Sequence, residues 1–474
     1  MRLQKTEYDL CIIGGGAAGL VTAAGAAALG AKVILIEKHR LGGDCLYTGC
    51  VPSKALIHAA GVANTVNTAQ QFGLSASLDP VSQSAVMQRI TDVIKTIEPN
   101  DSPERFRAMG VEVVFAEAQF IAQNCLLLED RKITARKFVL ATGSRPFIPP
   151  ISGLAGVNYL TNETIFSVTE NISHLIVIGS GAMGCEMAQS FVRLGAKVSL
   201  LSDTAILAGE DADMSGVVEQ KFIKDGIDLH LNSIVDSVEK NECGVSVYLD
   251  DATVINGTHL LVATGRRANI DKLGLDKADV KTAKGRLVID ERLRTTNKKI
   301  FACGDVAGPY LFTHMAEHQA GVVLRNTLFH LPAKAQNKNI PWCTFTAPEL
   351  ARVGLSELEA QQAGVKHRVY VFPFAELDRG IIDGETEGMA KVITSPKGKL
   401  LGACIVGHHA GELIAEYVLA ISQGLNISAL SNTIHIYPTL AQINKHVADQ
   451  RMKESLTSSR KKWIKRLFRL RGGQ

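Results

Sequence analysis

The chain turns sharply at Gly14-Gly15-Gly16-Ala17-Ala18-Gly19, and the patterns on either side of this turn decide the fold. Residues 9–13 before it have a buried-strand pattern, whereas residues 19–29 after it form an alanine-rich helical pattern. A second strand pattern, residues 32–36, follows at once. Strand, glycine turn, helix and strand in this order predict an α/β fold with a parallel, doubly wound sheet.

Each glycine of this turn has a separate task in a dinucleotide site. Gly14 permits the tight turn, Gly16 lets a pyrophosphate approach the backbone, and Gly19 lets helix and strand pack closely. Glu37 ends the second strand, 23 residues after Gly14, where a carboxylate would bind a ribose 2′-hydroxyl. Because strand, turn, helix and acid occur together, the pattern predicts a bound dinucleotide.

The same unit recurs 165 residues later. A strand pattern at 174–178 leads into Gly179-Ser180-Gly181-Ala182-Met183-Gly184, then a helix at 186–194 and a strand at 197–201. This turn predicts a second dinucleotide site, with Gly179, Gly181 and Gly184 beside the pyrophosphate. Ser202 stands where an acid would bind the ribose, and no arginine lies nearby for a 2′-phosphate. The sequence therefore leaves the choice between NADH and NADPH open.

Length and composition indicate a soluble protein of several domains. With 474 residues, 46% of them apolar, the chain is expected to form about three domains. No signal-peptide pattern precedes the first strand and no apolar run is long enough to span a membrane, so a cytoplasmic protein is expected. Nine scattered cysteines do not suit a secreted disulfide scaffold, and seven of them are expected to be small buried side chains.

The patterns divide the chain into five segments. We expect a first dinucleotide-binding domain at 1–150, a second at 151–270, and a return of the chain to the first domain at 271–339. Residues 340–450 mix strands and helices without a nucleotide fingerprint, which favours a dimerisation or substrate-side α+β domain. Residues 451–474 form a basic tail.

Cys45 and Cys50 differ from the other cysteines because they share one short segment with Gly49, just before Pro52. Five residues of regular helix rise about 7.5 Å, whereas a disulfide needs Cα atoms within roughly 4.4–6.8 Å. A bridge therefore requires an irregular turn, which Gly49 would supply before the helix continues at Pro52. A thiol near a helix N-terminus also has its thiolate favoured by the dipole. The two cysteines are predicted to be a redox-active pair.

The stretch Gly42 to Lys54 resembles the active-site helix of the FAD-dependent pyridine nucleotide-disulfide oxidoreductases, a family that includes dihydrolipoamide dehydrogenase, glutathione reductase and mercuric ion reductase. The resemblance covers about residues 5–450. It extends to Ala141-Thr142-Gly143, Ala263-Thr264-Gly265-Arg266, Phe301-Ala302-Cys303-Gly304-Asp305, Met315-Ala316-Glu317 and Gly411-Glu412-Leu413-Ile414.

The resemblance implies two cofactors. FAD would lie along Gly14 to Gly19, with Glu37 on its adenosine ribose and Asp305 near its ribityl chain. Gly143 and Gly265 would also belong to the cofactor sites. NAD(P)H would bind over Gly179 to Gly184 and pass a hydride to the flavin.

The resemblance also assigns roles around the thiols. Cys50 would contact the flavin and Cys45 would be the outer, interchange thiol that meets a small-molecule or metal-ion acceptor. Lys54, paired with Glu186, would lie beside the flavin and tune its electronics. A homodimer through residues 340–450 is expected, because the family's active site uses side chains of the partner subunit; no resident metal site and no nucleic-acid partner are expected.

One departure from the family concerns the acceptor. Disulfide-cleaving members have a His-Pro motif followed by a Glu, and the His protonates the leaving thiolate. Here Tyr437 precedes Pro438, and Gln442 stands in place of the Glu. His435 lies two residues too early and is interpreted as a solvated or structural histidine. Loss of a general acid/base typically costs about 10²–10⁴-fold, so disulfide reduction should be poor.

Three functions are compatible with this departure. The leading hypothesis is a non-standard acceptor such as a soft metal ion, as in mercuric ion reductase, or another electrophile, because a soft cation binds thiolates without needing that proton. The C-terminal cysteine pair and N-terminal metal-binding domain of mercuric reductase are not expected here. The alternatives are dihydrolipoamide dehydrogenase-like exchange, with His435 or a water as the acid/base, and a membrane-associated redox-sensing flavoprotein.

The tail is strongly basic and amphipathic. Residues 451–474 contain nine Lys and Arg against the single acid Glu454, a net +8, so the rest of the chain is about −4. Trp463, Leu467 and Leu470 fall on one helical stripe within residues 460–471. This pattern favours contact with an anionic membrane surface or a partner; a disordered tail or a helix docked on the protein's own acidic body are the alternatives.

Overall fold

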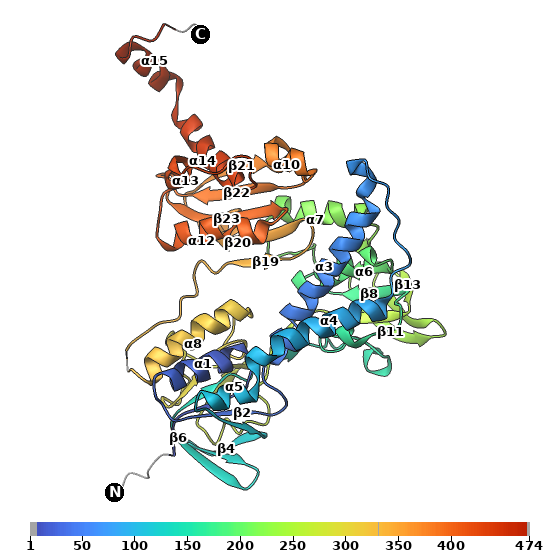
Figure 1. The fold of residues 1–474 in the computed structure, drawn as a ribbon, viewed down its shortest axis with the longest axis vertical. Helices are drawn as coiled ribbons and strands as arrows, with labels where there is room; N and C mark the ends of the chain where they lie inside the picture. The colour runs from blue at the N-terminus through green and yellow to red at the C-terminus, as the bar shows by residue number, and fades with distance from the viewer. Residues whose placement is uncertain (1–6, 330, 472–474) are drawn as a thin grey trace. The chain divides into compact units, whose positions relative to one another are not determined.

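A computed structural model of the chain describes residues 7–329 and 331–471. Residues 1–6 of the predicted first domain and 472–474 of the predicted tail lie outside the described residues. The chain forms two compact units (Figure 1). The first unit comprises residues 1–179, 190–203 and 233–336, and the second comprises residues 180–189, 204–232 and 337–474.

The first unit is built on a parallel sheet of five strands in the order β3-β2-β1-β6-β18. The strands are β1 (Tyr8–Ile13), β2 (Val33–Glu37), β3 (Glu112–Phe115), β6 (Arg131–Leu140) and β18 (Ile300–Ala302). Ile13 lies opposite both Ile36 and Leu140, so the central strands end at one edge of the sheet. Such an edge is where α/β sheets bind ligands, and the predicted doubly wound sheet is confirmed.

Helices cover this sheet because their alanine-rich faces are buried. Ala18, Leu20 and Ala23 of α1 (Ala17–Ala28) are almost inaccessible to solvent. Helix α8 (Thr313–Thr327) lies beside α1 (Figure 1). Near the start of β6 an antiparallel hairpin continues the sheet, formed by β4 (Ala118–Ala122) and β5 (Cys125–Leu128). The first unit also contains α2 (Gly43–Tyr47), α3 (Cys50–Asn67), α4 (Gln83–Ile97), α5 (Pro103–Ala108), β16 (Thr282–Ala283) and β17 (Arg286–Leu287).

The second glycine turn lies at the edge of a smaller parallel sheet, β9-β8-β14. Its strands are β8 (His174–Ile178), β9 (Lys197–Leu201) and β14 (His259–Val262), and α6 (Ala182–Arg193) connects β8 to β9. An antiparallel sheet, β11-β12-β13, and a ribbon of β7 and β15 also belong to the first unit, whereas residues 180–189, which include most of α6, belong to the second. Their bounds are β7 (Ser144–Pro146), β11 (Val235–Asn241), β12 (Gly244–Leu249), β13 (Val254–Gly257) and β15 (Arg266–Ala268).

The second unit contains a five-stranded antiparallel sheet, in the order β19-β20-β23-β22-β21. Its strands are β19 (Trp342–Thr344), β20 (Glu349–Gly354), β21 (Arg368–Pro373), β22 (Met389–Thr394) and β23 (Leu400–Gly407). The other elements of this unit are α7 (Ala212–Lys224), β10 (Asp228–His230), α9 (Glu357–Gln362), α10 (Asp378–Asp383), α11 (Ala410–Leu413), α12 (Ala415–Ser422), α13 (Ser428–Asn432), α14 (Gln442–Ser455) and α15 (Ser458–Leu467).

Two details of the second unit differ from the sequence patterns. The helix expected from Ala410 is interrupted at Ile414, so α11 and α12 are separate helices. The basic tail forms α15, which begins two residues before the predicted amphipathic stretch and ends at Leu467. Among the described residues, no helix is both long and apolar enough to cross a bilayer.

Candidate functional site

The first glycine turn is so tightly packed that side chains are excluded from it. Gly14 has φ +109°, and a Cβ there would lie 2.2 Å from the Ala141 carbonyl oxygen. A Cβ on Gly19 would lie 1.9 Å from the Gly14 carbonyl oxygen, so helix and strand touch at this point. Gly16 faces Gly43, where an added Cβ would lie 2.7 Å from the Gly16 Cα. This bare backbone at a helix N-terminus fits the pyrophosphate of a dinucleotide.

Glu37 is fixed beside that turn. The backbone N–H of Gly15 donates to its carboxylate at 2.7 Å, and the N–H of His39 donates to the other oxygen at 2.8 Å. A carboxylate oriented in this way at the end of β2 has the position from which an acid accepts a ribose hydroxyl. The ribose contact itself stays a prediction.

A cavity of about 380 Å³ lies elsewhere in the first unit and is lined by Ser144, Arg266 and Asp305 among others. The Ser144 hydroxyl donates to the Asp305 carboxylate at 2.5 Å, and Arg266 Nε donates to the Ser144 hydroxyl at 2.7 Å. Arg266 also pairs with Asp44 at 2.8 Å, which links this cavity to the segment that holds the cysteines. Burial raises the pKa of Asp305. The cavity thus offers hydrogen-bond acceptors on its carboxylates and donors on its hydroxyl and guanidinium groups. The ribityl hydroxyls of FAD can both donate and accept, so the residues fit that cofactor.

The glycines Gly143 and Gly265 flank this cavity in the sequence. Both have positive φ, +67° and +134°, so the chain turns sharply at each of them, next to the β7–β15 ribbon. Cavity-lining Ser144 and Arg266 directly follow them. The two glycines therefore orient the residues that line the cavity.

An irregular turn separates the two cysteines. Helix α2 ends at Tyr47 and α3 begins at Cys50, two residues earlier than the predicted start at Pro52. Gly49 lies against α2, where a Cβ would lie 2.9 Å from the Asp44 carbonyl oxygen. The Asn162 amide holds the turn by donating to the Thr48 carbonyl at 3.1 Å. The break makes Cys50 the first residue of an 18-residue helix.

Electrostatics distinguishes the two sulfurs, which are free thiols in this structure. A hydrogen bond from Cys45, together with the Thr313 hydroxyl and the charge of Lys54, lowers the pKa of Cys50 to about 6, although burial opposes this shift. The same hydrogen bond, and burial, raise the pKa of Cys45. At neutral pH the reduced pair therefore holds a thiolate on Cys50 and a proton on Cys45.

Thr313 is a site residue that the sequence patterns did not reveal. It is the first residue of α8, and its hydroxyl lies 3.3 Å from Cys45 Sγ and 3.5 Å from Cys50 Sγ. With one proton to donate, the hydroxyl can stabilise only one thiolate at a time. Its one sequence signal is its place two residues before the Met315-Ala316-Glu317 motif.

The second glycine turn repeats the geometry of the first. Gly179 has φ +111°, and a Cβ there would lie 2.6 Å from the Ala263 carbonyl oxygen. A Cβ on Gly181 would meet no atom within 4 Å, so the space over this turn is open. Gly184 lies in the first turn of α6, and Ser202 is buried directly after β9. The turn fits a second dinucleotide.

Glu186 and Lys54 lie in different compact units. Glu186 is buried in α6 and accepts a hydrogen bond from the Phe345 N–H at 3.0 Å. Lys54 lies on α3, one turn beyond Cys50. Their predicted pairing stays a prediction.

Residues 435–442 of the second unit, here called the acceptor segment because the family resemblance predicts that they face the acceptor, are arranged differently from the thiol pair. Tyr437 precedes a cis Pro438, is 65% exposed, and donates to an Asp378 carboxylate oxygen at 3.1 Å. His435 is not solvated: its side chain is 6% exposed, with Nε2 3.1 Å from Glu416 and Nδ1 3.1 Å from the Thr433 carbonyl. Both ring nitrogens are thus engaged locally, and Gln442 begins α14.

Two long stretches of the chain match models of a known protein family. The family model described as pyridine nucleotide-disulphide oxidoreductase matches residues 8–320, and the dimerisation-domain model of the same family matches residues 340–448. A mercuric reductase of Streptomyces lividans is 33% identical over 94% of this chain and 96% of its own length. A dihydrolipoyl dehydrogenase of Chlamydia muridarum is 33% identical over 92% of this chain and 95% of its own.

Solved structures with a similar fold also cover most of the chain. The Cu(II) complex of RclA, an HOCl-induced flavoprotein disulfide reductase of Escherichia coli, has a TM-score of 0.85 at 26% identity and covers 94% of this chain and 99% of its own. LpdA of Mycobacterium tuberculosis has a TM-score of 0.86 at 25% identity, covering 94% and 100%. The chain therefore belongs to the FAD- and NAD(P)H-dependent pyridine nucleotide-disulphide oxidoreductases.

Proposed function

We propose that the enzyme reduces a soft metal ion or another electrophile at Cys45 and Cys50, and not a disulfide. The observation that carries this proposal is the acceptor segment: Tyr437 occupies the position before Pro438, and both nitrogens of His435 are engaged within its own chain. No imidazole in this segment is thus available to protonate a leaving thiolate. Bound FAD would supply the path for electrons from NAD(P)H to the cysteine pair.

A soft cation fits the chemistry of the two sulfurs. It would displace the proton of Cys45 and bind the Cys50 thiolate, because soft metals prefer sulfur ligands. For a two-electron acceptor the reaction NAD(P)H + M²⁺ → NAD(P)⁺ + H⁺ + M⁰ balances without a proton delivered to a leaving group. The thiolate with pKa about 6 is present at neutral pH to receive the metal.

The relatives include support for a metal-ion acceptor and support for a disulfide or dithiol acceptor. Mercuric reductases are 32–33% identical to the chain, and one of the similar structures is a Cu(II) complex. A dihydrolipoyl dehydrogenase and a mycothione reductase are also 33% identical. Dihydrolipoamide dehydrogenase-like exchange is therefore the second candidate, with His435 as the acid/base once Glu416 releases it.

An assay of the purified enzyme with matched acceptors decides between the two. NADH and NADPH are each supplied with Hg(II), Cu(II), a quinone, lipoamide or glutathione disulfide. We expect metal- or quinone-dependent oxidation of the reduced pyridine nucleotide well above the rate with dioxygen, and slow turnover of both disulfides. Lipoamide turnover of hundreds per second would refute the proposal, and oxidation by dioxygen alone would indicate a redox-sensing flavoprotein.

A homodimer would complete this site. Ile434, Ile436 and Tyr437 are 96%, 78% and 65% exposed, which is unusual for three large side chains so close together. They lie within the matched dimerisation domain, so a second copy is the partner we propose for them. Tyr437 would then act in the partner's site. Sedimentation of the native protein should give a dimer, and Ile434→Asp with Ile436→Asp should give monomers without acceptor turnover.

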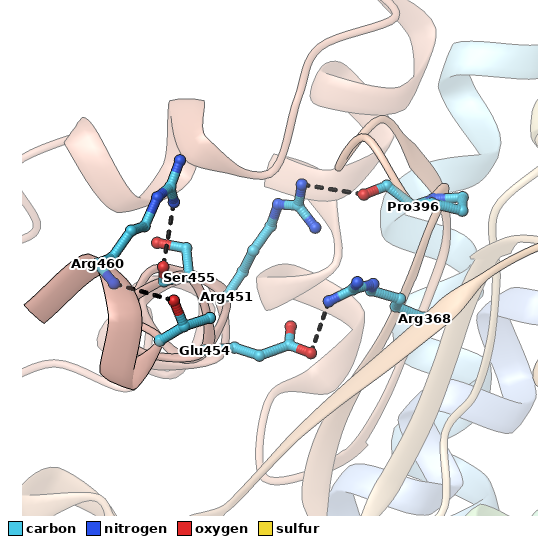
Figure 2. A pocket seen from close by; sticks show the side chains of 7 residues that line it. Arg368, Pro396, Arg451, Glu454, Ser455 and Arg460 are labelled. Atoms are coloured by element: carbon cyan, nitrogen blue, oxygen red, sulfur yellow. Dashed lines mark hydrogen bonds and ion pairs between the residues drawn. The ribbon is translucent and has the colours of Figure 1, made fainter.

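The tail suggests a separate docking role at an anionic membrane surface. On α15 Trp463 is 63% exposed and Leu467 is exposed as well, and Leu470, which follows the end of this helix, is also exposed. At the junction of α14 and α15, a surface pocket of about 300 Å³ is lined by Arg368, Arg451 and Arg460 (Figure 2). Glu454 neutralises Arg368 at 2.6 Å, so the three guanidiniums keep an excess of two positive charges. Such a site suits a lipid phosphate beside an amphipathic helix.

A flotation assay with anionic and neutral vesicles tests this role. The full chain should bind vesicles that contain an anionic lipid, and a chain ending at Thr457 should not. Trp463→Ala with Leu467→Ala keeps the charge and should weaken binding through the lost apolar contact. Equal binding of the truncated and full chains would exclude the tail as a membrane anchor.

A further inference from the structure

The two glycine turns occupy the same place in their sheets, so their residues can be matched one to one. The Gly14 N–H donates to the Ile36 carbonyl at 2.8 Å, and the Gly179 N–H donates to the Leu201 carbonyl at 2.8 Å. Ile36 and Leu201 lie opposite the strand residues that immediately precede each glycine. The residues that follow, Glu37 and Ser202, therefore hold equivalent positions.

These equivalent positions carry different groups. Glu37 presents a carboxylate that is hydrogen-bonded to the Gly15 N–H at 2.7 Å. Ser202 is 6% exposed, and its carbonyl accepts the Ser233 N–H at 2.9 Å, so it directly follows the strand as a small buried residue. The next residue, Asp203, is exposed. The first carboxylate after β9, that of Asp203, thus lies one residue later than the position equivalent to Glu37, and it is exposed to solvent.

The sequence around Asp203 contains no cation for a 2′-phosphate. No Lys or Arg occurs from Val198 to Gln220, whereas this run contains five acids. Three of them are paired within the second unit: Glu210 lies 3.5 Å from Arg352, and Asp211 and Asp213 lie 3.2 Å and 2.9 Å from Lys391. Asp203 is exposed and is the acid adjacent to the strand end.

We propose that Asp203 makes the enzyme selective for NADH over NADPH. A phosphate monoester carries about −1.5 to −2 charges at pH 7. A carboxylate within reach of the 2′ position of the ribose repels it, and the run from Val198 to Gln220 contains no guanidinium to compensate. The ribose 2′-hydroxyl of NADH, by contrast, is a donor that a carboxylate accepts. Through solvent this repulsion corresponds to a preference of at least about tenfold.

Equilibrium binding to the FAD-loaded enzyme tests the proposal without any acceptor. NAD⁺ and NADP⁺ are titrated by calorimetry, and the rates of anaerobic flavin reduction by NADH and by NADPH are measured in parallel. The native enzyme should bind NAD⁺ at least about tenfold more tightly, and rising ionic strength should narrow the gap. Asp203→Asn should remove most of the discrimination, and Asp203→Arg should reverse it.

A matched control distinguishes the effect of the Asp203 carboxylate from that of the other negative charges between Val198 and Gln220. Glu219→Gln also removes one charge from the same stretch, but on α7, and should leave the NAD⁺/NADP⁺ ratio unchanged. Unchanged flavin absorbance verifies that each variant is folded. Tighter binding of NADP⁺ by the native enzyme, or an equal effect of Asp203→Asn and Glu219→Gln, would overturn the proposal. Because nucleotide affinity is measured without an acceptor, this result is independent of whether metals or disulfides are reduced.

Discussion

We propose that the thiol pair and the acceptor segment serve the same reaction, yet their surroundings differ in kind. Around Cys50 a thiol, a hydroxyl and an ammonium group all favour one thiolate. Around His435, by contrast, a carboxylate and a carbonyl engage both nitrogens of the ring, and the neighbouring Tyr437 extends into solvent. Electron delivery to sulfur and proton delivery to a leaving group thus depend on separate groups of residues, and our proposal is that this chain keeps the first without the second.

Removal of the Cys50 thiolate is expected to have the largest effect on activity. Cys50→Ser should reduce acceptor-dependent NADH oxidation by at least about 10³-fold, the scale of losing an enzyme's nucleophile. Flavin reduction by NADH in a stopped-flow instrument should persist, because the glycine turns are untouched. Cys343→Ser, which alters a cysteine of the second unit, is the control and should keep full activity. Retained turnover in Cys50→Ser would mean that electrons reach the acceptor without this sulfur.

A double substitution tests the proposed lack of a proton donor in the acceptor segment. Tyr437→His with Gln442→Glu should raise lipoamide turnover by about 10²–10⁴-fold, because a general acid/base contributes that much. Metal-dependent turnover should change little, since no leaving thiolate is involved. The two single substitutions serve as controls, and each should have a smaller effect. A double variant that stays folded and still fails to reduce lipoamide would show that the acid/base is not what limits disulfide chemistry.

The pH dependence separates the two regions without any substitution. The pKa of Cys50 is lowered to about 6 in the folded, reduced enzyme. The thiolate is therefore present above that pH and is lost as pH falls through it, so near pH 5 about one-tenth remains. Rates of alkylation by iodoacetamide, and the long-wavelength thiolate–flavin absorbance, should both follow this curve. A midpoint near the ordinary thiol pKa would contradict the assigned hydrogen bonds.

Local sequence patterns predicted the glycine turns because the tight turn needs glycine for local reasons. Gly14 has φ +109°, and Gly19 packs against the Gly14 carbonyl oxygen within the same turn, whereas the contact of Gly14 with Ala141 joins distant segments. Glu37 was identifiable for the same reason, since strand length fixes its distance from Gly14. The sheet type and the strand ends thus follow from periodicity and from where glycines interrupt it.

Contacts between distant segments could not be predicted in this way. Thr313 lies 263 residues from Cys50, and nothing in the spacing of a threonine marks it as a thiol partner. The partner of His435 is Glu416, 19 residues earlier on α12, and that contact depends on how α12 packs. The start of α3 at Cys50 was also missed, because the proline rule favours a start near Pro52 whereas the Gly49 turn begins the helix earlier.

Thr313 offers the smallest but most specific test of the thiol side. Thr313→Val removes the hydroxyl that contacts both sulfurs and keeps the shape of the side chain. A hydrogen bond to a charged group contributes about 1.5 kcal/mol, so the pKa of Cys50 should rise by about one unit. Thiolate absorbance titrated against pH measures that shift, and Thr313→Ser, which keeps the hydroxyl, should restore the native midpoint. Acceptor turnover at pH 8 should barely change, because both forms are then largely ionised; an unchanged midpoint in Thr313→Val would assign the low pKa to Cys45 and Lys54 alone.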